Sequence, residues 1–131
     1  MSTMTENELA TIVVSIAFEI HSNLGPGLFE SVYETIMEYE LIHCRNLSVH
    51  RQTPIPVIWK NQKLDLGFRS DIIIENKLII EIKSVEAVAP VHYKQLLTYL
   101  KLTNIKLGLL INFNEELIKT GIKRVVNGLQ N

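Results

Sequence analysis

The stretch GFRSDIIIENKLIIEIKS, residues 67–84, decides the fold. It contains two apolar segments rich in β-branched residues, separated by the polar residues 75–77. This pattern predicts a β-hairpin. Because side chains alternate along a strand, Glu81 and Lys83 lie on the same face of the second strand. Asp71 on the first strand is a third charged group among these apolar residues.

The length of the hairpin loop decides whether Asp71 joins that face. A loop of three residues, 75–77, pairs Asp71 with Glu81, whereas a turn of two residues puts Asp71 on the opposite face. We predict the longer loop or a bulge, with Asn76 or Lys77 in the left-handed conformation and less strain at the asparagine. The two carboxylates then meet at the edge of an apolar sheet.

Two carboxylates and one ammonium group on a poorly hydrated face favour metal chemistry. Carboxylates held together repel each other unless a cation lies between them, and their hard oxygen atoms suit Mg²⁺ or Mn²⁺. Such an ion activates a water molecule and stabilises a phosphoryl oxygen, while Lys83 could orient the nucleophile. The pattern predicts metal-assisted phosphodiester hydrolysis. The alternative is a simple ion pair between Glu81 and Lys83, and the spacing alone does not separate the two.

Two motifs resemble known ones. Asp71 followed by residues 81–83, Glu-Ile-Lys, resembles the metal-binding core of the PD-(D/E)XK nuclease superfamily. Upstream, residues 27–33, GLFESVY, resemble the signature of the GxxExxY protein family, which is grouped in that superfamily. The resemblance extends over residues 12–127. Ser70 stands where the superfamily has a proline, at a position that varies widely among such enzymes.

This resemblance implies an α/β fold with a restriction-endonuclease-like, three-layer core. The expected mixed β-sheet is flanked by helices, in the order ααβββαββ. The resemblance also implies a metal-dependent nuclease, in which Asp71, Glu81 and the backbone carbonyl of Ile82 hold Mg²⁺ or Mn²⁺. Glu30, from the helix before the sheet, joins the metal directly or through water. Lys83 positions the attacking water, so all the core positions hold competent residues.

A helix that begins near Pro90 carries a further resemblance. Gln95-x3-Tyr99 is similar to the Q-x3-Y element of other branches of the superfamily, where this helix packs beside the active site. The resemblance assigns Gln95 and Tyr99 to positioning of the substrate or the catalytic lysine. It assigns His92 to phosphate contact or to indirect support of the site. Without the resemblance, Gln95 and Tyr99 are ordinary helix-surface residues one turn apart.

Four more polar side chains have an expected place. By the resemblance, Tyr33 hydrogen-bonds within the metal cluster. Arg69 shares the face of the acidic pair and could touch a phosphate, or could form an ion pair with Glu75 or another acid. Glu34 and Glu38 are expected to form a solvated acidic surface.

Periodicity predicts the other elements. Apolar residues at helical spacing indicate helices over residues 6–24 and about 28–44, the second with Phe29 in its buried stripe. Thr5 and Glu8 could form a capping box at the first helix. Extended segments are expected at 49–59, from residue 64 after a turn at 61–63, at 106–113 and, as an edge strand, at 122–126.

Length and composition set the class of protein. With 131 residues, 47% of them hydrophobic, we expect a single folded domain over residues 1–131. No apolar run approaches membrane-spanning length, so no membrane partner is expected. The apolar segment 9–18 follows Glu6 and Glu8 and no Lys or Arg, which argues against a signal peptide. The single cysteine, Cys44, permits no internal disulfide and fits a cytoplasmic location.

Charge is distributed unevenly, although the formal net charge is −1. Residues 1–50 contain seven acidic residues and one basic residue, a balance of −6, while residues 51–131 contain twelve basic and seven acidic residues, a balance of +5. The net charge of −1 excludes a protein that coats nucleic acid. The basic half contains the candidate site and could engage a phosphate backbone, or the imbalance could be chance.

We expect nucleic acid as the partner, DNA rather than RNA. We also expect a homodimer or a targeting partner, because so small a chain offers little surface for sequence readout. Two other functions stay open. One is a non-catalytic nucleic-acid- or protein-binding module that keeps the acidic cluster for stability alone. The other is an oligomeric interaction protein, in which acidic and basic halves of different copies meet and self-association is salt-sensitive.

Overall fold

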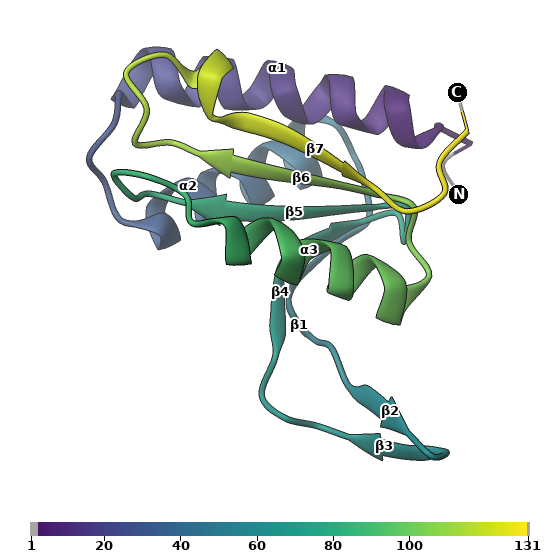
Figure 1. Cartoon of the computed structure of the whole chain (residues 1–131). Coiled ribbons are helices and arrows are strands. Elements are labelled where there is room, and N and C mark those ends of the chain that lie inside the picture. Colours follow the sequence, from purple (N-terminus) through teal and green to yellow (C-terminus); the bar gives the residue numbers. More distant parts are fainter. Residues whose placement is uncertain (1–2, 131) are drawn as a thin grey trace.

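A five-stranded mixed sheet lies at the centre of the computed structural model, which describes residues 3–130 (Figure 1). The strand order is β1-β4-β5-β6-β7. Of the four pairings, β5 with β6 is parallel and the other three are antiparallel. The strands are β1 Val49–Pro54, β4 Arg69–Ile74, β5 Leu78–Lys83, β6 Leu107–Asn112 and β7 Ile122–Val126.

Helices cover both faces of the sheet, which confirms the expected three-layer α/β fold (Figure 1). Two helices, α1 (Glu6–Leu24) and α2 (Glu30–Tyr39), pack on one face, and α3 (Pro90–Thr103) packs on the other. The expected capping box forms, because Thr5 and Glu8 each accept a hydrogen bond from the backbone N–H of the other. α3 is the crossover that a parallel β5–β6 pair requires.

The two faces of β5 bury different residues. Ile79 packs with α3, whereas Leu78, Ile80 and Ile82 pack with α1 and α2. The expected alternation is confirmed. By the same alternation, the side chain of Glu81 lies on the α3 face of the sheet.

The loop between β4 and β5 has the expected three residues. The ladder leaves residues 75–77 unpaired. Glu75 and Asn76 are left-handed, with φ of 52° and 53°. The expectation is confirmed at Asn76, and Glu75 is a second left-handed residue that the sequence did not predict.

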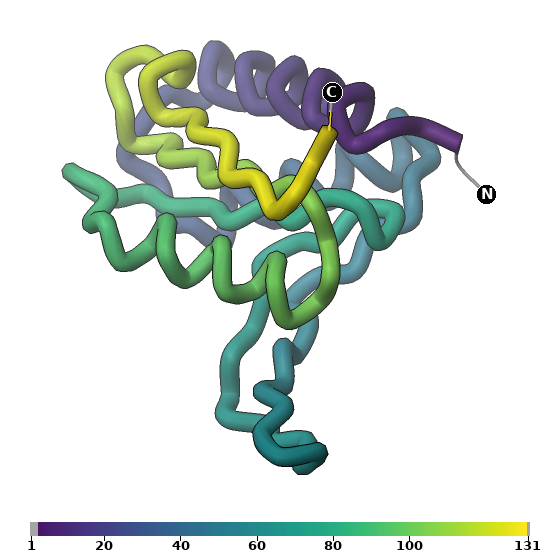
Figure 2. The backbone as a smooth tube through the Cα atoms, turned by 45° about the vertical axis from the view of Figure 1, so that its right-hand side comes forward, coloured from purple at the N-terminus to yellow at the C-terminus, as the bar shows by residue number. Residues whose placement is uncertain are grey.

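The chain differs from the expected order of elements between β1 and β4. β2 (Val57–Trp59) and β3 (Gln62–Leu64) form a separate antiparallel sheet, so five strands rather than three precede α3. The turn between them lies at 60–61, where both residues are left-handed, and not at 61–63. This hairpin extends away from the body of the molecule in two views (Figure 1 and Figure 2). We call residues 55–68 the arm.

Local chemistry explains why the strands are interrupted. Pro54 and Pro56 lack the N–H groups that would extend the ladder of β1. On the return path, Gly67 has a φ of 83° and donates its N–H to Asp65 Oδ1 over 3.1 Å. This side-chain turn suits glycine and separates β3 from β4.

α2 is shorter than the expected helix over 28–44. It begins at Glu30 and is followed by a π-helical segment, Glu40–Cys44. Phe29 is the residue before the helix and is 83% exposed, so its expected burial is wrong. The buried stripe begins at Tyr33 instead.

The last described elements are short. A 3₁₀ turn, η2 (Ile118–Gly121), leads directly into β7, which is the edge strand that the sequence predicts. Within residues 3–130, none of the helices has the length and apolar character needed to cross a membrane.

Candidate active site

Strands β4 and β5 part beside Asp71 and Glu81. Their backbone ladder ends at the pair of Ile72 and Ile80. Beyond it, each acidic side chain binds the backbone of the opposite strand. Asp71 N–H donates to Glu81 Oε2 over 2.8 Å, and Ile82 N–H donates to Asp71 Oδ2 over 2.8 Å. The structure thus brings the two predicted carboxylates together and holds them by reciprocal hydrogen bonds.

Burial disfavours the charged form of this pair. Glu81 is only 5% exposed. Burial, followed by the charge of Asp71, raises the pKa of Glu81 to about 8. Burial also raises the pKa of Asp71, and the charge of Glu34 adds to that shift. Lys83 acts against both shifts without cancelling them. The positive charge near the pair is therefore too small to keep both carboxylates ionised, and a divalent cation could supply the remainder.

The donor set fits a hard divalent ion. Within the described part of the chain, no three His, Cys, Asp or Glu side chains gather into a metal cage. Mg²⁺ commonly binds one or two carboxylates and keeps water or phosphate oxygens as its other ligands. Asp71 and Glu81 each use one carboxylate oxygen to accept a backbone hydrogen bond. Two carboxylates are enough protein ligands for such an ion.

Glu34 belongs to this cluster, although the sequence indicates a solvated position. It is 5% exposed, forms an ion pair with Arg51 and accepts a hydrogen bond from Gln52 Nε2 over 3.0 Å. The same nitrogen lies 3.4 Å from Asp71 Oδ1. Glu38 also pairs with Arg51, at 3.3 Å. The expected solvated position is therefore wrong for Glu34, because β1 brings cationic and amide groups against α2. The side chain of Glu38 remains 29% exposed.

Gln52 reaches both acids from a kinked position inside β1. Its φ is 52°, and the other left-handed non-glycine residues among residues 3–130 lie in turns, loops or helix ends. The ladder skips it, since Arg51 pairs with Ile72 and Thr53 pairs with Ser70. Such strain is typical of functional sites. The sequence carries no signal for it, because glutamine has no preference for this conformation.

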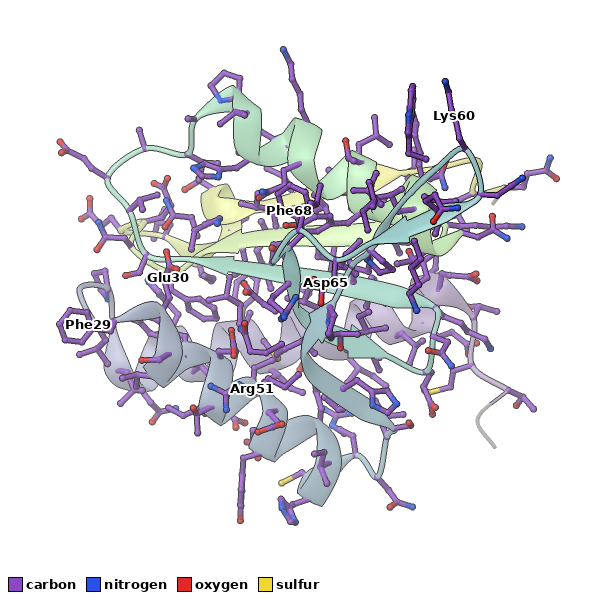
Figure 3. The ribbon with its side chains drawn as sticks, turned by 90° about the horizontal axis from the view of Figure 1, so that it is seen from below. Phe29, Glu30, Arg51, Lys60, Asp65 and Phe68 are labelled. Carbon is purple, nitrogen blue, oxygen red and sulfur yellow. The ribbon has the colours of Figure 1, made fainter. Side chains whose placement is uncertain are left out.

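Glu30 lies at a different point of the site. It is exposed, and its Oε2 accepts a hydrogen bond from the Ser84 N–H over 3.1 Å, directly after Lys83 (Figure 3). No direct hydrogen bond joins it to Asp71 or Glu81 within the residues described. Glu30 therefore fixes the chain at the end of β5, and its part in metal binding stays a prediction.

Tyr33 does not bond within the carboxylate cluster. Its buried hydroxyl donates to the Gly25 carbonyl over 2.7 Å and accepts from the Leu28 N–H over 3.1 Å. Its ring stacks on Phe113, with centroids 4.3 Å apart. The expectation for Tyr33 is wrong, because the side chain anchors the loop that leads into α2 and so positions Glu30.

α3 brings Tyr99 to the acidic pair. Tyr99 is 4% exposed, and burial, followed by the charges of Glu81 and Asp71, raises its pKa. It is not an ordinary helix-surface residue. Gln95 and His92 are half-buried on the same helix, and no side-chain hydrogen bond ties either to the carboxylates in the part of the chain that the structure describes. Their roles stay predictions.

Arg69 takes its alternative partner. Its guanidinium lies 3.3 Å from Asp65 Oδ1, and both side chains are exposed, by 39% and 61%. An exposed pair of this kind contributes no more than about 1 kcal/mol. The guanidinium is therefore held only weakly where the arm joins β4.

Comparison with known proteins identifies the superfamily of the chain. The sequence model of the PD-(D/E)XK nuclease superfamily matches residues 7–125, a range that contains Asp71, Glu81 and Lys83. Neither a curated protein nor a solved structure matches the chain. Three helices around a mixed five-stranded sheet are consistent with the superfamily fold. The chain belongs to the PD-(D/E)XK nuclease superfamily.

Proposed function

We propose that the protein is a Mg²⁺-dependent nuclease of the GxxExxY family, which hydrolyses phosphodiester bonds of nucleic acid. The observation that carries the proposal is the pair of hydrogen bonds by which the carboxylates of Glu81 and Asp71 accept from the Asp71 N–H and the Ile82 N–H, where β4 and β5 part. Membership of the superfamily favours nuclease chemistry. The burial and mutual repulsion of the two carboxylates supply the physical reason for a divalent metal.

In the proposed mechanism the residues of the site bind and orient. Asp71 and Glu81, with the backbone carbonyl of Ile82, would hold Mg²⁺ or Mn²⁺, and Glu30 would assist directly or through water. An ion held there would supply Lewis-acid chemistry, namely a lower pKa for a water bound to it and withdrawal of charge from a phosphoryl oxygen. Lys83 donates a hydrogen bond to the attacking water and offsets the negative charge that develops on the phosphate.

Residues around the acidic pair would position the substrate. We assign Tyr99 and Gln95 to positioning of the substrate or of Lys83, and His92 and Arg69 to phosphate contacts. Tyr99 has the strongest support, because the charges of the acidic pair act on its hydroxyl. Arg69 is supported by its exposure and its weak partner.

The proposed substrate is DNA rather than RNA, and the proposed working form is a homodimer in the cytoplasm. The positive balance of residues 51–131 supports a polyanionic partner. The single cysteine, Cys44, is exposed and free, which fits a reducing compartment.

Calorimetric titration with Mg²⁺ and Mn²⁺ tests the metal site. We expect binding by the wild type, loss of binding in Asp71→Ala and Glu81→Ala, and retention in Glu116→Ala, which removes an exposed acid outside the site. A wild type that binds neither ion at millimolar concentration contradicts the proposal.

A cleavage assay on single- and double-stranded DNA and RNA tests the reaction. Metal-dependent cleavage that is lost in the same two variants supports the nuclease. Metal binding without cleavage of any substrate favours the alternative, a binding module that retains the nuclease fold.

A further inference from the structure

The arm exposes apolar side chains that a folded monomer normally buries. Every residue from 58 to 69 is exposed. A two-stranded hairpin is marginally stable without a covering layer, and a concentration of exposed apolar groups marks an interaction surface. The large apolar side chains are Ile58 (56% exposed), Trp59 (64%), Leu64 (40%), Leu66 (60%) and Phe68 (39%).

The charge of the arm and its base is positive. Three basic residues stand against one acid between residues 55 and 69, a balance of +2. The acid, Asp65, already pairs with Arg69. Lys60 and Lys63 flank the tip, and Lys60 Nζ lies 5.9 Å from the centre of the Trp59 ring. An indole beside ammonium groups is a surface that complements bases and phosphates.

The base of the arm adjoins the candidate active site. Ile55 N–H donates to the Phe68 carbonyl over 2.9 Å, which closes the base. The Phe68 ring lies 6.3 Å from that of Tyr99, whose hydroxyl is acted on by the acidic pair. In Figure 3, Phe68 and Asp65 lie over the centre of the molecule, and the Lys60 side chain points away from it at the outer end of the arm. A strand held along the arm would therefore lead to the carboxylates.

We propose that the arm binds single-stranded nucleic acid, with Trp59 stacking on an unpaired base and Lys60 and Lys63 contacting its phosphates. The proposal rests on the proposed function only in taking nucleic acid as the ligand. Stacking contributes about 1–3 kcal/mol per base, whereas duplex binding depends on many phosphate contacts. Two exposed lysines are few for a duplex, but an exposed indole among apolar side chains suits unpaired bases.

Fluorescence gives a direct test, because Trp59 is the only tryptophan in the chain. We would titrate the wild type with oligothymidylate and with a duplex of the same length, in EDTA so that nothing is cleaved. The expected result is quenching of Trp59 by the single strand at concentrations where the duplex has little effect. An unchanged spectrum at saturation, with saturation established by anisotropy of a labelled oligonucleotide, would overturn the proposal.

Substitutions in the arm test whether the arm is the part of the molecule that contacts the oligonucleotide. In the anisotropy assay we expect Trp59→Ala to weaken binding of the single strand by about 5- to 100-fold. We expect Lys60→Ala with Lys63→Ala to weaken binding and to flatten its dependence on salt. Tyr39→Ala, which removes an exposed aromatic side chain from the body of the molecule (58% exposed), should bind as the wild type does. Equal affinity of Trp59→Ala and wild type would contradict the proposal.

The test is separate from the proposed nuclease and from a rival occupant of the arm. The oligonucleotide titrations are made in EDTA and need neither metal binding nor cleavage, so failure of the nuclease mechanism leaves their result intact. Failure of the arm proposal likewise leaves metal binding at Asp71 and Glu81 untouched. Sedimentation velocity tests a second copy of the chain as the occupant. Self-association that Trp59→Ala abolishes, with unchanged oligonucleotide affinity, would replace the nucleic acid by that second copy.

Discussion

Two hairpins in this chain each reverse through two consecutive left-handed residues, but they have opposite surroundings. The turn between β4 and β5 has left-handed residues at 75 and 76, and the turn between β2 and β3 has them at 60 and 61. Yet β5 is buried at every position except Lys83, while β3 is exposed throughout. The comparison teaches that turn geometry sets where the chain reverses. Packing against the rest of the chain then decides whether the hairpin is buried in the core or left exposed to solvent.

The difference in burial between the two hairpins also separates two sets of charged side chains. Asp71 and Glu81 lie in the buried hairpin, where backbone bonds hold them and low solvation perturbs their ionisation. Lys60 and Lys63 lie on the exposed hairpin. In the proposed function the first pair is held in place for an ion, whereas the exposed second pair is proposed to contact a flexible ligand.

The largest expected effect comes from shortening a buried side chain of the first hairpin. Ile80 is fully buried, so Ile80→Ala should lower the free energy of unfolding by about 2–5 kcal/mol, through lost transfer energy and a cavity. Ile58 is 56% exposed, so Ile58→Ala should change the free energy of unfolding by no more than about 0.5 kcal/mol. Urea unfolding measures both. Equal losses would mean that the arm is part of the cooperative core.

The next effect is a dependence of stability on pH. The pKa of Glu81 is about 8 in the folded chain, against an ordinary 4.5. Because the folded state keeps a proton that the unfolded state has lost, stability in EDTA should fall as pH rises from about 4.5 to about 8, by an amount on the order of a few kcal/mol.

Matched variants test the source of that dependence. Glu81→Gln should remove most of it, and the exposed-site control Glu116→Gln should keep it. Saturating Mg²⁺ should restore stability at pH 8, because the ion favours the ionised carboxylates. Thermal unfolding at a series of pH values measures this, and a flat profile for the wild type contradicts it.

Substitutions of Gln52 should give smaller effects. The backbone of this residue is strained, and its side chain contacts both Glu34 and Asp71. Both Gln52→Ala and Gln52→Gly remove the bridge between Glu34 and Asp71 and should weaken Mn²⁺ binding by about 10-fold. Gln52→Gly should nevertheless be the more stable variant by about 1 kcal/mol, because glycine accepts a φ of 52°. Calorimetry and urea unfolding measure the two effects separately. Unchanged metal affinity would show that the bridge does not orient Asp71.

The smallest effect comes from the two turns themselves. Glu75→Gly should raise the free energy of unfolding by about 0.5–1 kcal/mol, because glycine relieves the left-handed strain in a hairpin that unfolds with the core. Lys60→Gly relieves the same strain but should leave global unfolding unchanged. Urea unfolding and amide exchange in the two hairpins measure this. An increase for Lys60→Gly equal to that for Glu75→Gly would remove the distinction between scaffold and arm.

Several features of the site follow from local rules. A three-residue loop and the two-residue period of a strand are enough to pair Asp71 with Glu81. Pro90 predicts the start of α3, which begins at that residue. Each of these features involves residues that are close in sequence or are constrained by a short loop.

Other features depend on packing between distant segments. Glu34 is buried by Arg51 and Gln52, which lie on a strand beyond its own helix. Tyr33 finds its partners in the backbone of the preceding loop, although its place in a motif suggests the metal cluster. Gln52 is left-handed although its residue type does not favour that conformation. No period or propensity encodes these contacts.

The sequence by itself determined the class of fold, the reversal of the central hairpin and the meeting of its two carboxylates. Hydrophobic period, turn chemistry and loop length are local quantities, so a short stretch of chain contains the information they need. Only the tertiary structure decided that Glu34 is buried, that Gln52 bridges two acids and that residues 58–68 of the arm are exposed. The physical reason is that burial is a property of what covers a residue, and the covering segments here come from elsewhere in the chain.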